Sequence, residues 1–183
     1  MRRKGIVPVL LVVALGATLI YAQSNASKLK GLLTGLEEVP VVSTPGNGTF
    51  RAVISKDETQ IAYQLSYSDM QSNVTQAHIH LGKANTNGGI QVWLCSNLPS
   101  PPTPVPPPVI QTCPQRSGTI TGVITGAHLV GPASQGIVTG ELGELIKAMR
   151  DGNTYVNVHT EVSPGGEIRS QIGTDNSKSK AHH

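Results

Sequence analysis

Two histidines one residue apart, His78 and His80, are the residues of this sequence best suited to do chemistry. They stand in the stretch 77–81, Ala-His-Ile-His-Leu. Successive side chains of a β-strand point to opposite faces, so on a strand the two imidazoles share one face and the apolar residues share the other. Neutral imidazole is a good ligand for copper and zinc. The pattern predicts a strand with one core face and one face that carries two metal ligands.

A third histidine lies in a second strand-like segment, 155–160, Tyr-Val-Asn-Val-His-Thr. If the two segments are neighbouring strands, three imidazoles converge, and we predict a metal site. Its expected ligands are His78, His80 and His159. Side chains expected to contact and orient these ligands are Asn157, Glu161 and Glu167. No carboxylate or thiolate stands out as a fourth ligand, so the prediction is a three-coordinate or open site.

The same histidines also have a structural interpretation, which the sequence leaves open. In it, His78 and His80 form hydrogen bonds across the sheet and hold the turn at 163–166. The other three histidines are not assigned to the site, because one lies in a predicted surface turn and two end the chain: His128, His182 and His183.

Short segments of alternating polarity, separated by turn-forming residues, occupy most of the chain. Strands are expected at 29–36, 49–55, 60–67, 75–82, 90–95, 117–125, 154–161 and 167–172. One segment differs, because its apolar residues recur at helical spacing: Leu142, Leu145, Ile146 and Met149. We therefore expect an all-β fold, an antiparallel sandwich or barrel, with one short helix near 141–150.

Cys95 and Cys113 are the only two cysteines of the chain. Their spacing fits no zinc-binding pattern, and two cysteines in an exported protein most often pair, so we predict a disulfide. It would close the base of the proline-rich stretch 99–108, which cannot form a strand ladder and is expected to be a stiff surface loop.

The N-terminus has the layout of an export signal. Arg2, Arg3 and Lys4 precede an apolar run, residues 5–22, and small residues follow, which predicts a secretory signal peptide over 1–26. The alternative is an uncleaved membrane anchor formed by 5–22. We expect a secreted or periplasmic domain over 28–173, followed by a polar, disordered tail at 174–183. Its only membrane contact would be that N-terminal segment.

The charge balance excludes one class of partner. Without the three basic residues of the signal, the 14 basic residues become 11, equal to the 11 acidic ones. A neutral domain with few aromatic residues offers neither a basic surface nor stacking platforms for nucleic acid. We therefore expect no nucleic-acid partner.

Four motifs together carry a resemblance to a known family. They are Ala-His-Ile-His-Leu-Gly at 77–82, Leu-Cys-Ser-Asn at 94–97, Tyr-Val-Asn-Val-His-Thr at 155–160, and Pro-Gly-Gly-Glu-Ile-Arg at 164–169 with Gln-Ile at 171–172. With these motifs the chain resembles the CHRD (chordin) domain family over about 28–173. It departs from the family pattern at Ser170, where a glycine is usual, and in its longer proline-rich loop.

The resemblance implies an immunoglobulin-like β-barrel distantly similar to copper/zinc superoxide dismutase. That enzyme family uses a His-x-His strand and a later histidine for copper, and an arginine near the C-terminus that guides anions. The residues in similar places in chain order are His78, His80, His159 and Arg169. Counterparts of the zinc-loop histidines and of the metal-bridging histidine are missing, so the resemblance supports copper binding more than dismutation.

We therefore predict an exported metal-binding module, with copper as the expected ion and zinc as the alternative. A second interpretation is a metal-free extracellular interaction or matrix module with protein partners, as in the animal protein that names the family. A third is a dismutase-like redox enzyme. No nucleophile elbow or phosphate-binding glycine loop is present, and whether the chain is an enzyme stays open, with a binding role favoured.

Overall fold

The computed structural model describes residues 28–99 and 110–174. In chain order its strands are β1 (Lys28–Thr34), β2 (Asn47–Ile54), β3 (Ile61–Ser68), β4 (Val74–Leu81), β5 (Ile90–Ser96), β6 (Gly118–Ile124), β7 (Thr154–Thr160) and β8 (Ile168–Ile172). The helices are η2 (Gly35–Glu37), η3 (Gly126–His128), η4 (Ala133–Gln135) and α1 (Leu142–Arg150). The predicted all-β fold with one short α-helix is confirmed.

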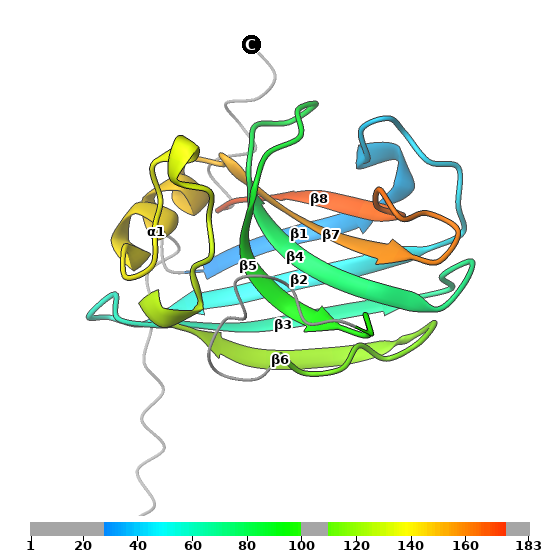
Figure 1. Ribbon diagram of the computed structural model, residues 1–183, viewed down its shortest axis with the longest axis horizontal. Coiled ribbons are helices and arrows are strands. Elements are labelled where there is room, and N and C mark those ends of the chain that lie inside the picture. The colour runs from blue at the N-terminus through cyan, green and yellow to red at the C-terminus, as the bar shows by residue number, and fades with distance from the viewer. Residues whose placement is uncertain (1–27, 100–109, 175–183) are drawn as a thin grey trace, which may run out of the picture.

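The strands form one antiparallel sheet of eight, in the order β5-β4-β7-β8-β1-β2-β3-β6. The sheet curls into a nearly closed barrel, so that its two edge strands, β5 and β6, approach each other (Figure 1). The amide of Gln111 bridges this seam, donating to the carbonyls of Leu94 on β5 and Thr121 on β6. Closing a sheet on itself removes the exposed edges at which other chains pair.

The predicted disulfide is confirmed, because Cys95 and Cys113 are bonded to each other. It joins the end of β5 to the segment that leads into β6, beside the seam. Most of the proline-rich stretch between the two cysteines, residues 100–109, lies outside the described residues. Disulfides persist in oxidising compartments, which agrees with an exported protein.

Alternation builds the interior of the barrel. In β2 and β3 buried and exposed residues alternate, and the inward side chains of β3 are Ile61, Tyr63, Leu65 and Tyr67, as the sequence predicts. The apolar face of α1 is buried in the same core and closes one end of the barrel (Figure 1). Burial of the apolar surface of such a core is the main favourable contribution to the free energy of folding.

The first strand is shorter than predicted. It ends at Thr34, and the next residues turn as η2 because the backbone of Val42 folds back onto Gly35, whose carbonyl accepts the Val42 N–H at 2.8 Å. A β-carbon at Gly35 would lie 2.2 Å from the Val42 carbonyl oxygen, so only glycine fits. This fold-back brings Glu38, which follows η2, into a buried position.

The segment expected to be a signal peptide or anchor (1–26) lies outside the described residues. So does the expected disordered tail (174–183), apart from its first residue, Thr174, which is described and buried. Within 28–99 and 110–174, none of the helices has the length and apolar character needed to cross a membrane.

Candidate metal centre

The outer face of the barrel carries a polar layer at the strands that hold the histidines. Residues directly opposite in an antiparallel ladder share a face. His78 on β4 pairs with Asn157 on β7, which pairs with Arg169 on β8, and His80 pairs with Tyr155. The other face of the same strands faces the core with Ala77, Ile79, Val156, Val158 and Ile168.

This outer layer is buried rather than solvated. Every residue of β7 is buried, whereas β2 and β3 alternate. Two loops cover the layer, one around Glu38 and Val39 and one around residues 83–88, and the Asn87 amide joins them by donating to the Val39 carbonyl at 3.1 Å. Polar side chains in such a layer need internal hydrogen-bond partners, because water is excluded.

The tautomer of His80 is fixed by the loop above it. Its Nδ1 lies 2.9 Å from the carbonyl oxygen of Gly88. A carbonyl oxygen only accepts, so the proton of the neutral ring is on Nδ1 and donates to Gly88. The other nitrogen, Nε2, therefore carries a free lone pair, and it is buried without a hydrogen-bond partner.

His159 is held in the same manner by the turn that follows its strand. Its Nδ1 donates to the carbonyl oxygen of Pro164 at 2.9 Å. Its Nε2 is therefore unprotonated as well. The structural interpretation expected His78 and His80 to hold the turn at 163–166; among the three, His159 is the residue bonded to it, and His80 is bonded to a different loop.

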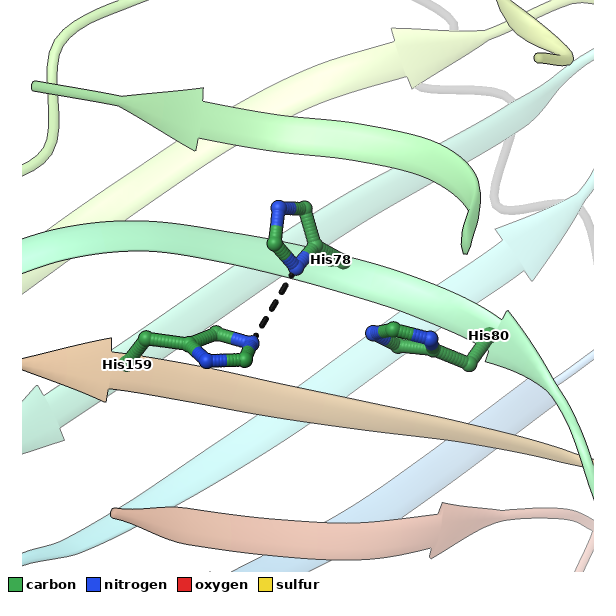
Figure 2. Close-up of side chains that lie close together, drawn as sticks. All are labelled: His78, His80 and His159. Atoms are coloured by element: carbon green, nitrogen blue, oxygen red, sulfur yellow. Dashed lines mark hydrogen bonds between the residues drawn. The ribbon is translucent and has the colours of Figure 1, made fainter. Parts of the chain in front are cut away.

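His78 completes the cluster and has no backbone carbonyl partner among the described residues. Its Nδ1 lies 3.2 Å from His159 Nε2 and, since that nitrogen has no proton, His78 is the donor. Figure 2 shows the rings of His159 and His80 facing each other, with His78 between and above them. One ligand nitrogen from each of the three residues can be chosen so that all lie within 4.8 Å of one another. An ion bound by three imidazoles lies about 2 Å from each nitrogen, so a small inward shift of the rings would let one ion contact all three.

Burial keeps all three rings neutral. Desolvation is the largest cause in each case: it lowers the pKa of His80 to about 4, lowers that of His78 well below its usual range, and lowers that of His159. The mutual repulsion of charged rings adds to the effect at His78. Neutral imidazole is the form that ligates metals, so at neutral pH little proton competition is expected.

A stack of rings and a cation supports His80. The ring of Tyr155 lies parallel to that of His80 at 4.6 Å between centroids, and the Arg169 guanidinium carbon lies 3.4 Å from the Tyr155 centroid on the ring's face. The guanidinium is buried and donates to the carbonyls of Lys83 and Thr86 and to the Asn87 side chain. Arg169 thereby holds the loop whose Gly88 carbonyl orients His80.

A sequence model of the CHRD domain family matches residues 29–172, which is most of the chain and includes every residue of the cluster. The chain belongs to the CHRD domain family. No curated protein and no solved structure matches it. The site is therefore described from its own geometry.

The two carboxylates expected near the ligands of this CHRD domain have other surroundings. Glu167 is fully buried and accepts hydrogen bonds from the hydroxyls of Thr44 and Thr160 and from the Gln71 N–H, so it ties three segments together. Glu161 is exposed, and the bond it accepts comes from Asn73 at 3.4 Å. Asn157 does lie at the cluster, with Oδ1 3.1 Å from His159 Nε2.

One buried titratable residue beside the histidine cluster was missed by sequence reasoning. Glu38 is only 5% exposed, and one of its carboxylate oxygens has no partner. Burial raises its pKa to about 7, against the opposing effects of the Arg169 charge and of hydrogen bonds from Val39 and Asn157. Glu-Glu-Val-Pro at 37–40 has the composition of a surface turn, so no local signal marks Glu38 as buried.

Glu38 explains the second glycine of the Pro-Gly-Gly-Glu motif. Gly166 has φ +127, and a β-carbon there would lie 2.4 Å from the nearer carboxylate oxygen of Glu38. The unusual Ser170 is explained as well: its side chain packs where residue 31 of β1 is glycine, since a β-carbon at Gly31 would lie 2.8 Å from Ser170 Oγ. A serine is accommodated on β8 because its neighbour has no side chain.

Proposed function

We propose that this CHRD domain binds one transition-metal ion, copper in first place and zinc in second, through His78, His80 and His159. The observation that carries the proposal is the pair of backbone carbonyls, of Gly88 and Pro164, that place the protons of His80 and His159 on Nδ1. Ligating histidines commonly donate their second ring N–H to a carbonyl or carboxylate, which fixes the tautomer and the ring orientation. Both rings thus have an unprotonated Nε2 available as a ligand before any ion arrives.

A purely structural role explains this arrangement less well. It would leave His80 Nε2 buried without a partner, and an unsatisfied buried polar atom costs about 1–3 kcal/mol. It would also gather three rings whose positive charges repel each other. A bound ion accepts the lone pairs of all three nitrogens. The rings stay neutral, so no positive charge on the ligands repels the ion.

The ion would also set the tautomer of His78. In the described arrangement His78 donates its Nδ1 proton to His159. If His78 binds the ion through Nδ1, its neutral ring must carry the proton on Nε2 instead. That nitrogen is buried and has no hydrogen-bond partner among the described residues. His78 is therefore the adaptable ligand, while His80 and His159 are held fixed.

We propose further that the domain works outside the cytoplasm, as a secreted or periplasmic metal-handling module or as one in which the metal is structural. The disulfide and the signal-like N-terminus support this location. Imidazole ligands suit both copper and zinc, and copper is placed first because nitrogen sites bind Cu²⁺ more tightly than Zn²⁺.

The single tryptophan of the chain offers a direct test. Trp93 packs edge-on against His78, with ring centroids 4.1 Å apart. Addition of Cu²⁺ to purified, chelator-treated protein should quench its fluorescence, saturating at one ion per chain, and elemental analysis should find that ion. Copper content equal in the unaltered protein and in His80→Ala would reject the site.

Two controls make the test specific. His128→Ala removes a histidine that accepts a hydrogen bond from the Thr125 N–H and lies outside the cluster, so it should retain the ion. A chain lacking His182 and His183 should also retain it, which excludes binding by the terminal pair. Loss of the ion in either control, with His80→Ala unaffected, would place copper elsewhere.

A further inference from the structure

The amide of Asn157 stands in an unusual relation to His159. Its Oδ1 lies 3.1 Å from His159 Nε2. Neither atom has a proton to share, because the His159 proton is on Nδ1, where it donates to Pro164. Two acceptors at hydrogen-bond distance repel each other unless a donor or a cation lies beside both. The His78 N–H donates to the nitrogen, and among the described residues no hydrogen-bond donor reaches the amide oxygen from that side.

An amide can turn over and present its NH₂ group instead, but Glu38 opposes this. The Asn157 side chain lies close enough to the Glu38 carboxyl group to lower its pKa against the effect of burial. A carboxylate only accepts hydrogen bonds, so it favours the orientation in which the NH₂ group is on the Glu38 side and Oδ1 faces the imidazoles, as it does at His159.

Glu38 is itself held in place. Its carboxylate packs against Gly166, where no side chain is tolerated, and lies within the electrostatic reach of Arg169. Asn157 is fixed on β7 between His78 on one neighbouring strand and Arg169 on the other. The amide oxygen is thus presented by a rigid strand and oriented by a buried carboxyl group.

We propose that Asn157 Oδ1 is the fourth ligand of the metal ion, and that Glu38 is the positioning residue that turns this oxygen toward it. The inference rests on the proposed function, since it describes the same site. It fills the position for which the sequence offers no carboxylate or thiolate. It also gives a preference among ions, because an amide oxygen added to three imidazoles suits Cu²⁺ or Zn²⁺ better than the soft Cu⁺.

Removing the oxygen tests the ligand. Asn157→Leu keeps the approximate size without an oxygen, and we expect Cu²⁺ affinity, measured through Trp93 fluorescence, to fall at least about tenfold. The Cu²⁺ electron paramagnetic resonance spectrum should change as one oxygen ligand is lost. Gln91→Leu is the matched control, because Gln91 is a fully buried amide on β5 that packs against Gly131, and it should leave affinity and spectrum unchanged.

Exchanging the two partners tests the positioning role. In Glu38→Gln the carboxyl group that holds the NH₂ of Asn157 is lost, and a smaller fall in affinity with a partial spectral change is expected. In the double variant Glu38→Gln with Asn157→Asp, the new amide can donate to the new carboxylate, so an oxygen ligand is again presented. Affinity in the double variant should exceed that of Asn157→Asp alone, in which no group at position 38 donates to the new carboxylate. Equal affinity in the two would overturn the role of Glu38.

A measurement on the unaltered protein keeps the proposal testable if the variants fold poorly. In a crystal structure of the zinc-loaded chain, Oδ1 should lie about 2 Å from the ion, the usual length for an oxygen ligand. An amide that points away from the ion overturns the inference, as does an Asn157→Leu protein with unchanged affinity and spectrum. Failure of the unaltered protein to bind any ion is a different result, because it overturns the proposed function itself.

Discussion

The carboxyl group of Glu38 packs directly against the backbone of Gly166. A β-carbon at Gly166 would lie 2.4 Å from Glu38 Oε1, well inside van der Waals contact. The two residues are 128 positions apart in the chain, one in the loop that follows η2 and the other in the turn between β7 and β8. Through this contact Gly166, the second glycine of the Pro-Gly-Gly-Glu motif, packs beside the Glu38 carboxyl group next to the histidine cluster.

Gly166→Ala should therefore destabilise the domain. The new methyl group collides with Glu38, and φ +127 is strained for any residue with a β-carbon, so we expect a loss of about 2–4 kcal/mol in the free energy of unfolding. Urea denaturation measures it. The neighbouring Gly165 is the control, because a β-carbon there meets nothing within 4 Å, and Gly165→Ala should change stability by less than about 0.5 kcal/mol. Equal effects of the two substitutions would contradict the packing described here.

Arg169→Lys should loosen the loop over the cluster. The guanidinium serves acceptors on Lys83, Thr86 and Asn87 at once, and an ammonium group cannot reproduce this planar fork. We expect about 2–3 kcal/mol of lost stability and faster amide hydrogen exchange in residues 83–88. Lys147→Ala, which removes one exposed ion pair with Asp151, serves as a control and should leave the free energy of unfolding nearly unchanged. Unchanged exchange in the loop would show that Arg169 does not hold it.

The disulfide should contribute to stability through the barrel seam. Replacing Cys95 and Cys113 by alanine opens a loop with a sequence separation of 18, for which chain entropy alone predicts a loss of about 3 kcal/mol. Denaturation with and without a reductant measures it: the unaltered protein should lose stability on reduction, and the double variant should not respond. If the reductant leaves the unaltered protein as stable as before, the bridge does not constrain the unfolded chain as argued.

Much of the fold follows from local pattern. The alternation in β2 and β3, the helical spacing of Leu142 to Met149 and the shared face of His78 and His80 are properties of neighbouring residues, and each element was predicted within a few positions. The convergence of His159 needed only that β4 and β7 be neighbours, and they are. Periodicity carries this information because a face must be apolar to be buried.

The surroundings of the histidines did not follow from the sequence. Alternation alone would leave the outer face of β7 in water, yet loops without periodicity fold over it and bury all of its residues. Glu38 becomes buried through that long-range packing. Its sequence neighbours are typical of a surface turn, so they do not predict this burial. Arg169 was expected to guide anions, on resemblance; its guanidinium is buried and bonded to the loop above it. Whether it also attracts anions stays a prediction.

The buried groups at this site should give the metal-free protein two opposing pH effects. His80 has a pKa of about 4 when folded, below its ordinary 6.5, so the unfolded chain binds more protons in this range and stability is lost as pH falls from about 6.5 toward 4. His78 and His159 act in the same direction. Glu38 has a pKa of about 7 when folded, above its ordinary 4.5, so its contribution is lost as pH rises from about 4.5 through 7.

Glu38→Gln separates the two effects. The amide stays neutral at every pH, so the loss between pH 4.5 and 7 disappears while the histidine effect remains. Relative to the unaltered protein, the variant should gain about 3 kcal/mol in unfolding free energy between pH 4.5 and pH 8, because the Glu38 pKa is about 7 in the fold against 4.5 in the unfolded chain. Urea denaturation of chelator-treated protein at several pH values measures the difference. Parallel pH profiles for the two proteins would mean that Glu38 is ionised in the fold at neutral pH, and that its charge is stabilised by Arg169 and Asn157 more strongly than burial opposes it.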